Sequence, residues 1–200
     1  IEHARLAEVE QAERLLAKDL DQAAKIQMGL LPRCAPAISG FDLFGQTAAC
    51  RGVGGDYYDF MAYPDGSFMM LVGDVAGKGM PAALMMSSLQ ARVHVLFENP
   101  GNLGAHVVRL NKAVAANCPD NRFITLFICN IDPQTGEVTY CNAGHNPPLI
   151  VRANGEVEKL TTGGIILGIM PRFVYQEGQA RLESGDSLVL FSDGVTEAAR

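Results

Sequence analysis

Three aspartates lie beside glycine at the ends of predicted strands, and their residue type suits metal-ion chemistry. Asp56 follows a pair of glycines, Asp74 follows one glycine after a hydrophobic run, and Asp193 precedes one after another such run. Taken singly, an Asp-Gly pair is more typical of an ordinary turn. Three converging carboxylates would repel one another unless a cation lay between them. Hard oxygen ligands without nearby His or Cys are typical of Mg²⁺ or Mn²⁺.

The glycine-rich run that begins at Gly73 is not a nucleotide-binding P-loop. Lys78 is followed by Gly79 and not by Ser or Thr, so the spacing GxxxxGK[ST] is absent. A helix is nevertheless predicted to begin directly after this loop. Its N-terminus would favour an anion near the three aspartates.

Composition and charge argue against several classes of protein. The 200 residues are 48% hydrophobic and 19% charged, which is typical of one globular domain, with or without a helical attachment. The net charge of -6 argues against a nucleic-acid partner. No apolar run approaches the length of roughly 18 residues that a membrane span needs. The five cysteines form no CxxC pair, so we expect neither disulfides nor zinc, and a cytoplasmic location.

The elements that would position the aspartates follow a helical arm. Residues 1–31 carry apolar side chains at mixed spacings of three and four, which predicts one long amphipathic helix that ends before Pro32. This helix is either a linker or coiled-coil arm, or a helix packed on its own domain. We take residues 32–200 as the remaining domain.

Within that domain, turn signals separate predicted strands from two consecutive helices. The Pro-Asp-Gly run at residues 64–66 between two apolar runs predicts a hairpin. Hairpin-linked strands around two helices indicate an antiparallel α+β fold. The predicted helices are residues 81–97 and 103–117, and the predicted strands are residues 41–48, 56–63, 68–75, 122–131, 138–142, 148–152, 156–160, 173–179 and 187–191.

Six stretches together make the chain resemble the PPM-type, metal-dependent Ser/Thr protein phosphatases, in their bacterial SpoIIE/RsbU branch. They occur in the order that this family shows, from about residue 22 to the end of the chain. The stretches are AKIQMGLLP (24–32), RGVGGDYYD (51–59), DVAGKG (74–79), RFITLF (122–127), NAGHNPP (142–148) and SDGVTE (192–197).

The resemblance implies a fold and a set of ligands. The fold would be an α-β-β-α sandwich, in which helices flank two central antiparallel sheets, with a two-metal site at one end. Asp74 would bridge two Mn²⁺ or Mg²⁺ ions, Asp56 and the carbonyl of Val75 would bind one of them, and Asp193 the other. A metal-activated water would then attack phosphoserine or phosphothreonine of a protein.

Further residues keep alternative interpretations. Arg51 could hold the substrate phosphate or form a surface ion pair. His145 could be a general acid, but we prefer a histidine that organises its loop by bonding backbone. Asp59 should face the opposite side of its strand from Asp56 and be structural. His94 lies on a predicted helix with no carboxylate motif around it, and we assign it no role.

The resemblance also implies partners. The substrate would be a phosphorylated protein similar to an anti-anti-sigma factor. The arm would connect this domain to an upstream sensor or receiver domain, and it would form a homodimer. The family pattern continues past Asp193 to a late metal-binding Asp. We therefore expect this domain to lack its usual C-terminal end and its metal site to be incomplete. The alternative function is a catalytically degenerate phosphatase-fold module that binds a signalling partner.

Overall fold

Two β-sheets form the centre of the molecule in the computed structural model, which describes residues 2–47, 52–118 and 122–196. The larger sheet has the order β1-β2-β3-β4-β7, with β8 also paired to β4, and the smaller sheet has the order β6-β5-β9. The strands of the larger sheet are β1 (Tyr57–Ala62), β2 (Phe68–Val75), β3 (Ile124–Ile131), β4 (Glu137–Ala143), β7 (Gly163–Gly164) and β8 (Gly178–Arg181). Those of the smaller sheet are β5 (Leu149–Val151), β6 (Val157–Lys159) and β9 (Ser187–Val189).

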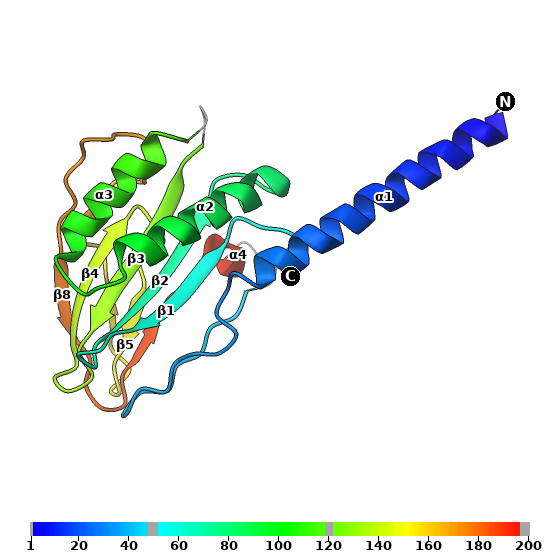
Figure 1. The fold of residues 1–200 in the computed structure, drawn as a ribbon. Helices are drawn as coiled ribbons and strands as arrows, with labels where there is room; N and C mark the ends of the chain where they lie inside the picture. The colour runs from blue at the N-terminus through cyan, green and yellow to red at the C-terminus, as the bar shows by residue number, and fades with distance from the viewer. Residues whose placement is uncertain (1, 48–51, 119–121, 197–200) are drawn as a thin grey trace.

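Helices cover the face of the larger sheet that points away from the smaller one. α2 (Met80–Leu96) and α3 (Leu103–Ala115) follow β2 directly and lie side by side across this face (Figure 1). Asn102 caps α3, because its side chain accepts a hydrogen bond from the amide of Ala105. The short helix α4 (Asp193–Thr196) follows β9.

The alternation of side chains along the strands builds one core on each face of the larger sheet. On β2, Met69 and Leu71 point toward the helices and join a cluster that includes Met86 of α2. Phe68 and Val72 point the other way, toward the smaller sheet, and join a second cluster. The layers are therefore the helices, the larger sheet and the smaller sheet. The end of β2 that carries Asp74 lies where the two sheets meet.

The predicted α+β class with two central sheets is confirmed. The strands pair antiparallel, except for a two-residue parallel contact between β4 and β7, and an isolated parallel bridge joins Leu126 of β3 to Gly144. The described residues place helices on one outer face only, whereas the sandwich implied by the family has them on both. The hairpin predicted around residues 64–66 is also confirmed, as β1 and β2.

Two predicted strands differ from the structure. Among the described residues of the segment 41–48, only Phe41 makes a β-bridge, to Ile38, and no strand forms. Residues 173–177 form no strand either, and the strand in that region is β8. β8 starts where Gly178 can pair with Tyr140 of β4, so the partner strand decides its position.

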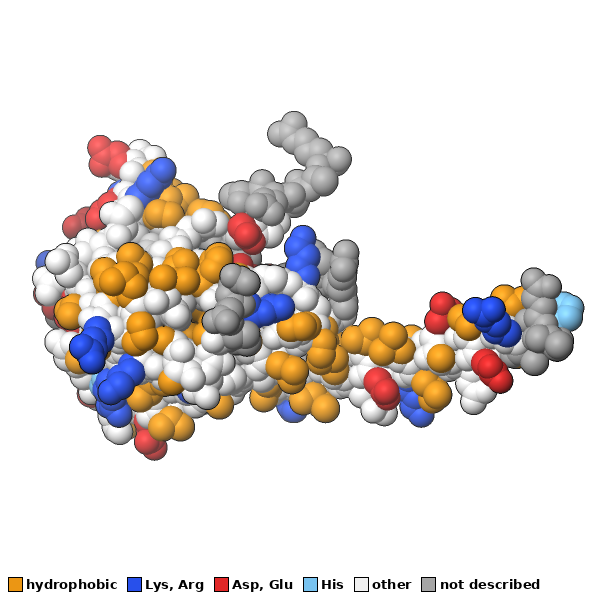
Figure 2. Space-filling view, turned by 90° about the horizontal axis from the view of Figure 1, so that it is seen from above, with side chains coloured by type: hydrophobic (Ala, Val, Ile, Leu, Met, Phe, Trp, Pro, Cys, Tyr) orange, Lys and Arg blue, Asp and Glu red, His pale blue; other side chains and the backbone are white. Residues whose placement is uncertain are grey.

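The helix α1 (Glu2–Met28) projects away from the sheets as a rod (Figure 1). It exposes large apolar side chains, such as Leu16 (62% exposed) and Ile26 (69% exposed), between charged ones (Figure 2). This exposure favours the arm over a helix packed along its own domain. The boundary between arm and domain stays a prediction. Within the described residues, no helix combines the length and apolar character that crossing a membrane requires.

Candidate metal centre

Asp56 and Asp74 lie side by side because of the register of the hairpin. Asp56 directly precedes β1, and the next residue, Tyr57, pairs with Gly73 of β2. A Cβ added at Gly55 would lie 2.6 Å from the carbonyl oxygen of Val75 and 3.2 Å from Oδ1 of Asp74. Only glycine fits this contact, which explains the glycine in front of Asp56. The two aspartates and the Val75 carbonyl therefore meet at one end of the larger sheet.

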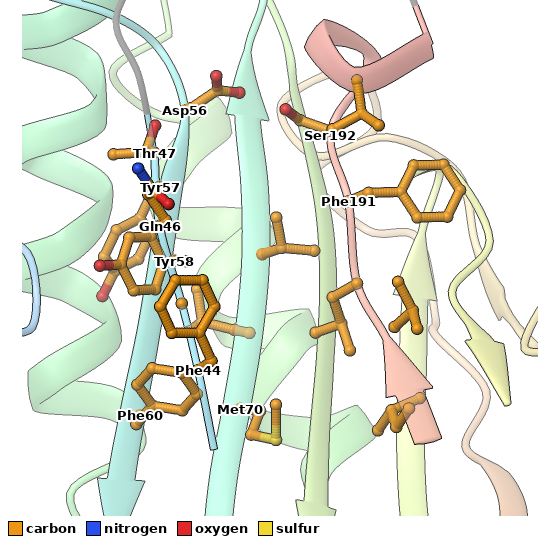
Figure 3. Close-up of a pocket in the computed structure, with 17 residues that line it drawn as sticks. Phe44, Gln46, Thr47, Asp56, Tyr57, Tyr58, Phe60, Met70, Phe191 and Ser192 are labelled. Atoms are coloured by element: carbon orange, nitrogen blue, oxygen red, sulfur yellow. The ribbon is translucent and has the colours of Figure 1, made fainter. Parts of the chain in front are cut away.

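Asp193 approaches the same place from the smaller sheet. It begins α4, shortly after β9 ends. Burial raises the pKa of Asp56, a hydrogen bond with Ser192 counteracts this, and the negative charge of Asp193 raises the pKa further. Ser192, the residue before Asp193, lines the same end of a cavity as Asp56 (Figure 3). The structure thus brings the three predicted carboxylates toward one end of the two sheets.

A cavity of about 360 Å³ runs from this end along the gap between the edges of the two sheets. Asp56 and Ser192 lie at one end of it, and Phe44, Tyr58 and Phe60 line it further along (Figure 3). Among the described residues that line it, none is Lys or Arg. The cavity therefore suits apolar groups rather than phosphate, and the polar chemistry is confined to its carboxylate end.

The donors at this end match a hard cation in type. Carboxylates of Asp56, Asp74 and Asp193 and the carbonyl of Val75 are the oxygen ligands that Mg²⁺ and Mn²⁺ prefer. The pKa of Asp56 is raised mainly by burial and further by the negative charge of Asp193, and a cation bound beside Asp56 would oppose both effects. Within the described part of the chain, however, no three His, Cys, Asp or Glu side chains stand close enough together to form a ready metal-binding group.

The loop after β2 is held by Arg122, which sequence reasoning placed only in a motif. Its Nη1 donates to the carbonyl oxygen of Ala76 at 3.1 Å. The guanidinium also fills the space beside Gly77, whose φ of 111° suits glycine. The amide of Ala76 donates to the carbonyl of Phe123 at 2.9 Å. Arg122 and Phe123 therefore fix the backbone that directly follows Asp74 and Val75.

His145 is buried and connects the two sheets next to the carboxylates. Its Nε2 lies 3.1 Å from the carbonyl oxygen of Phe191, and its Nδ1 lies 2.8 Å from Oγ1 of Thr125. A carbonyl can only accept, so Nε2 donates and Nδ1 accepts from the hydroxyl. Burial lowers the pKa of His145, which agrees with a neutral ring.

The neighbours of His145 explain why its ring matters for the site. Thr125 pairs with Asp74 across β2 and β3, and Phe191 lies two residues before Asp193. Asn142 holds the histidine's own backbone by accepting from its amide and donating to its carbonyl. This is the loop-organising role that the sequence analysis preferred over a general acid.

Asp59 lies on the opposite face of β1 from Asp56, as the strand period predicts. Its carboxylate accepts from the Tyr57 hydroxyl at 2.6 Å and from the Phe60 amide at 2.8 Å, and lies 2.8 Å from Nε2 of His94 on α2. The expectation that no carboxylate surrounds His94 is wrong, because the 35 residues between the two positions hid the contact.

Two residues complete the account of the candidate site. Arg51 lies outside the described residues, so its role in phosphate binding stays a prediction. Gln27, near the end of α1, bonds to the backbone of Gly54, two residues before Asp56. Sequence reasoning missed this contact, because the two residues are 27 positions apart and no local pattern connects them.

The fold is that of the PP2C phosphatase domains. The solved SiaA-PP2C domain of Pseudomonas aeruginosa superposes with a TM-score of 0.76 and 22% identity, over 92% of this chain and 74% of that one. The RsbU and RsbW domains of Rv1364c from Mycobacterium tuberculosis give a TM-score of 0.66 and 28% identity, over 75% of this chain and 42% of that one.

Within this class, the sequence identifies the family. The family model for Stage II sporulation protein E (SpoIIE) matches residues 64–200, so the chain belongs to the SpoIIE family. Phosphoserine phosphatase RsbU of Bacillus subtilis is 32% identical over 197 residues. The match covers 98% of this chain but only 58% of RsbU. The resemblance stated from the motifs is confirmed.

Proposed function

We propose that this chain is a metal-dependent phosphatase of phosphoserine or phosphothreonine in a signalling protein. The observation that carries the proposal is the approach of Asp56, Asp74 and Asp193 from two sheets to one end of the molecule. The similarity to phosphoserine phosphatase RsbU supports the reaction.

For the metal ligands, we propose the residues that the resemblance of the motifs implies. Asp74 would contact two Mn²⁺ or Mg²⁺ ions, Asp56 and the Val75 carbonyl one of them, and Asp193 the other. Bound there, such ions lower the pKa of water and stabilise negative charge on phosphate oxygens. The Ser192 hydroxyl favours the ionised form of Asp56, which is the form that can act as a ligand.

Other residues would hold the reacting groups in place. His145 ties the segment before Asp193 to β3, and Arg122 ties the loop after Val75 to the same sheet. Arg51, at the start of the same motif as Asp56, would bind the substrate phosphate through two of the N–H donors of its guanidinium group. From the family resemblance of the motifs, we propose a substrate similar to an anti-anti-sigma factor.

The test is phosphate release from a phosphoserine protein with and without Mn²⁺, using the wild type, Asp74→Asn and Asp19→Asn. Asp19 is exposed on α1 and undergoes the same chemical change. We expect metal-dependent turnover that Asp74→Asn reduces by about a hundredfold or more, and that Asp19→Asn leaves intact. Equal turnover in the two variants would refute the assignment.

One observation favours a second candidate, a degenerate phosphatase fold that binds a signalling partner. In the described residues the carboxylates do not form a ready metal-binding group. Such a module would bind the phosphorylated and unphosphorylated partner without releasing phosphate, whether or not Mn²⁺ is present. Stable binding without turnover in the same assay identifies this alternative.

We also propose that α1 connects an upstream sensor or receiver domain and pairs with a second copy of the chain. The exposed Leu6, Leu16 and Ile26 side chains support this, because pairing would remove them from water. Light scattering of the whole chain and of a chain that begins at residue 22 tests the pairing. A monomer in both cases would contradict it.

A further inference from the structure

Apolar side chains of both sheets wall the cavity that ends at the carboxylates. Four of them belong to paired residues of β1 and β2: Tyr58, Phe60, Met70 and Val72. From the smaller sheet, Leu188 of β9 and Leu190 just after it line the cavity. At about 360 Å³, the cavity has the size and the apolar lining that are typical of a ligand site.

An aromatic ring stands in water beside this cavity. Phe44 is 82% exposed, although it lines the cavity and lies near Tyr58 and Phe60 (Figure 3). Its segment is held close to β1, since a Cβ added at Gly45 would lie 2.5 Å from the ring of Tyr58. An exposed ring fixed next to an apolar cavity extends the surface that a bound partner would cover.

Strand β9 presents a backbone edge to the same cavity. It is the last strand in the order β6-β5-β9, and among the described residues it pairs with β5 alone. All residues from 188 to 192 line the cavity. Because successive side chains point to opposite faces of a strand, contact with each residue in turn means that the cavity meets the backbone edge. Such an edge can pair with an added strand.

The spacing of residues along the opposite wall matches that of an extended peptide. Asp56, Tyr58 and Phe60 follow one another at every second residue and all line the cavity. An extended segment has the same repeat, with side chains on one face at every second residue. A phosphoserine beside Asp56 would therefore place the side chains two and four residues away beside Tyr58 and Phe60.

The charge of the lining selects against acidic side chains in such a segment. Asp56 is the only charged residue among the described residues that line the cavity. A glutamate of a bound segment would lose water there without gaining a cationic partner. A leucine would gain from the removal of its side chain from water.

We propose that this cavity is a specificity site for the substrate protein, and that it binds an extended segment next to the phosphoserine. The backbone of the segment pairs with β9, and its apolar side chains two and four residues from the phosphoserine lie against Tyr58 and Phe60. Main-chain pairing of this kind supplies affinity, and pockets for alternate side chains supply specificity. The inference rests on the proposed function, because the phosphate sets the register of the segment.

The test measures fluorescence anisotropy of labelled peptides with the whole chain and Mn²⁺. Each peptide carries at its centre a phosphonate analogue of phosphoserine that water cannot cleave, so the readout is affinity and not turnover. The peptides differ only two and four residues to either side of the centre, where they carry leucine, asparagine or glutamate. We expect the leucine peptide to bind about tenfold more tightly than the asparagine peptide, and the glutamate peptide to bind most weakly.

Two further comparisons test the parts of the site. A leucine peptide with N-methylated backbone amides keeps its side chains but loses the donors to β9, and should bind about tenfold less tightly. Phe44→Ala should weaken binding of the leucine peptide by about fivefold, because it removes apolar surface beside the cavity. Leu84→Ala is the matched control, since Leu84 is 64% exposed on α2 and does not line the cavity.

The outcomes separate this proposal from the proposed function. Equal affinity for the leucine and asparagine peptides would overturn the specificity site alone and leave the phosphatase assignment intact. A leucine preference that is unchanged when serine replaces the phosphonate would also overturn it, because the cavity would then take an apolar segment unrelated to the substrate. The expected preferences without phosphate release from a phosphoserine protein would support the binding site and refute the reaction.

Discussion

The two faces of strand β1 carry one aspartate each, three residues apart, in opposite surroundings. On the helix face, Asp59 is surrounded by donors: the Tyr57 hydroxyl, the Phe60 amide and the ring of His94. On the sheet face, burial raises the pKa of Asp56, the hydroxyl of Ser192 counteracts this only in part, and the negative charge of Asp193 raises the pKa further. Hydrogen-bond donors of the fold surround Asp59, whereas Asp56 has a negatively charged neighbour.

This difference separates a structural acid from a functional one. A buried carboxylate with enough donors stabilises the fold, and its removal leaves those donors unpaired. A carboxylate placed beside another one destabilises the fold until a cation arrives. Residue type and position on the same strand do not distinguish the two, whereas their partners do.

The largest effect is expected at Asp56. Asp56→Asn should reduce Mn²⁺-dependent phosphate release by about a hundredfold or more, because a charged ligand is lost. Without metal, the same change should leave the free energy of unfolding equal or higher, since a carboxylate with a raised pKa is less stable ionised in the folded state. Phosphate release and urea unfolding measure the two. A clear loss of metal-free stability would show that Asp56 is structural.

Asp59 should behave in the opposite way. Asp59→Asn should lower the free energy of unfolding by about 1–3 kcal/mol, because the Tyr57 hydroxyl and the His94 ring lose an ionised acceptor. The Mn²⁺ affinity of the folded protein should change little. Urea unfolding and Mn²⁺ titration check this. If Asp59→Asn abolished Mn²⁺ binding at full stability, the distinction between the two faces would be lost.

The smallest effect concerns pH, through His145 on the sheet face. Burial lowers its pKa, so the unfolded state takes up a proton first as the pH falls below about 6.5. Stability is therefore complete above that pH and declines below it, by at most about 1.4 kcal/mol per pH unit for one group. His145→Gln should flatten this decline in metal-free urea unfolding between pH 7 and 5.

The control for the pH experiment is another histidine, His106. The pKa of His106 is also lowered, mainly by burial, so part of the decline should remain in His145→Gln. An identical pH profile for His145→Gln and the wild type would contradict the neutral, buried role of His145.

Local signals explain how much of the fold could be predicted. The hairpin of β1 and β2 depends on a Pro-Asp-Gly turn, and α2 on an uninterrupted apolar pattern, so both were predicted within a residue or two. Residues 41–47 and 173–177 also carry apolar side chains but form no strand. Whether an apolar run becomes a strand depends on a partner elsewhere in the chain.

The candidate site shows the same limit. The Asp-Gly pairs at strand ends were visible in the sequence, and the structure brings Asp56, Asp74 and Asp193 to one end. The contacts of Gln27 with Gly54 and of His94 with Asp59 bridge 27 and 35 residues. No local pattern records such a contact, because it exists only once the sheet and helices have packed.

The rod shape of α1 gives the contact at Gln27 a mechanical meaning. A helix of 27 residues is about 40 Å long, so a swing of ~10 Å at its far end is a tilt of about 14°. An atom ~4 Å from the pivot would then move by about 1 Å, which takes a bond of ordinary length beyond hydrogen-bonding range. A tilt of α1 by that angle would therefore be enough to break the hydrogen bonds between Gln27 and Gly54.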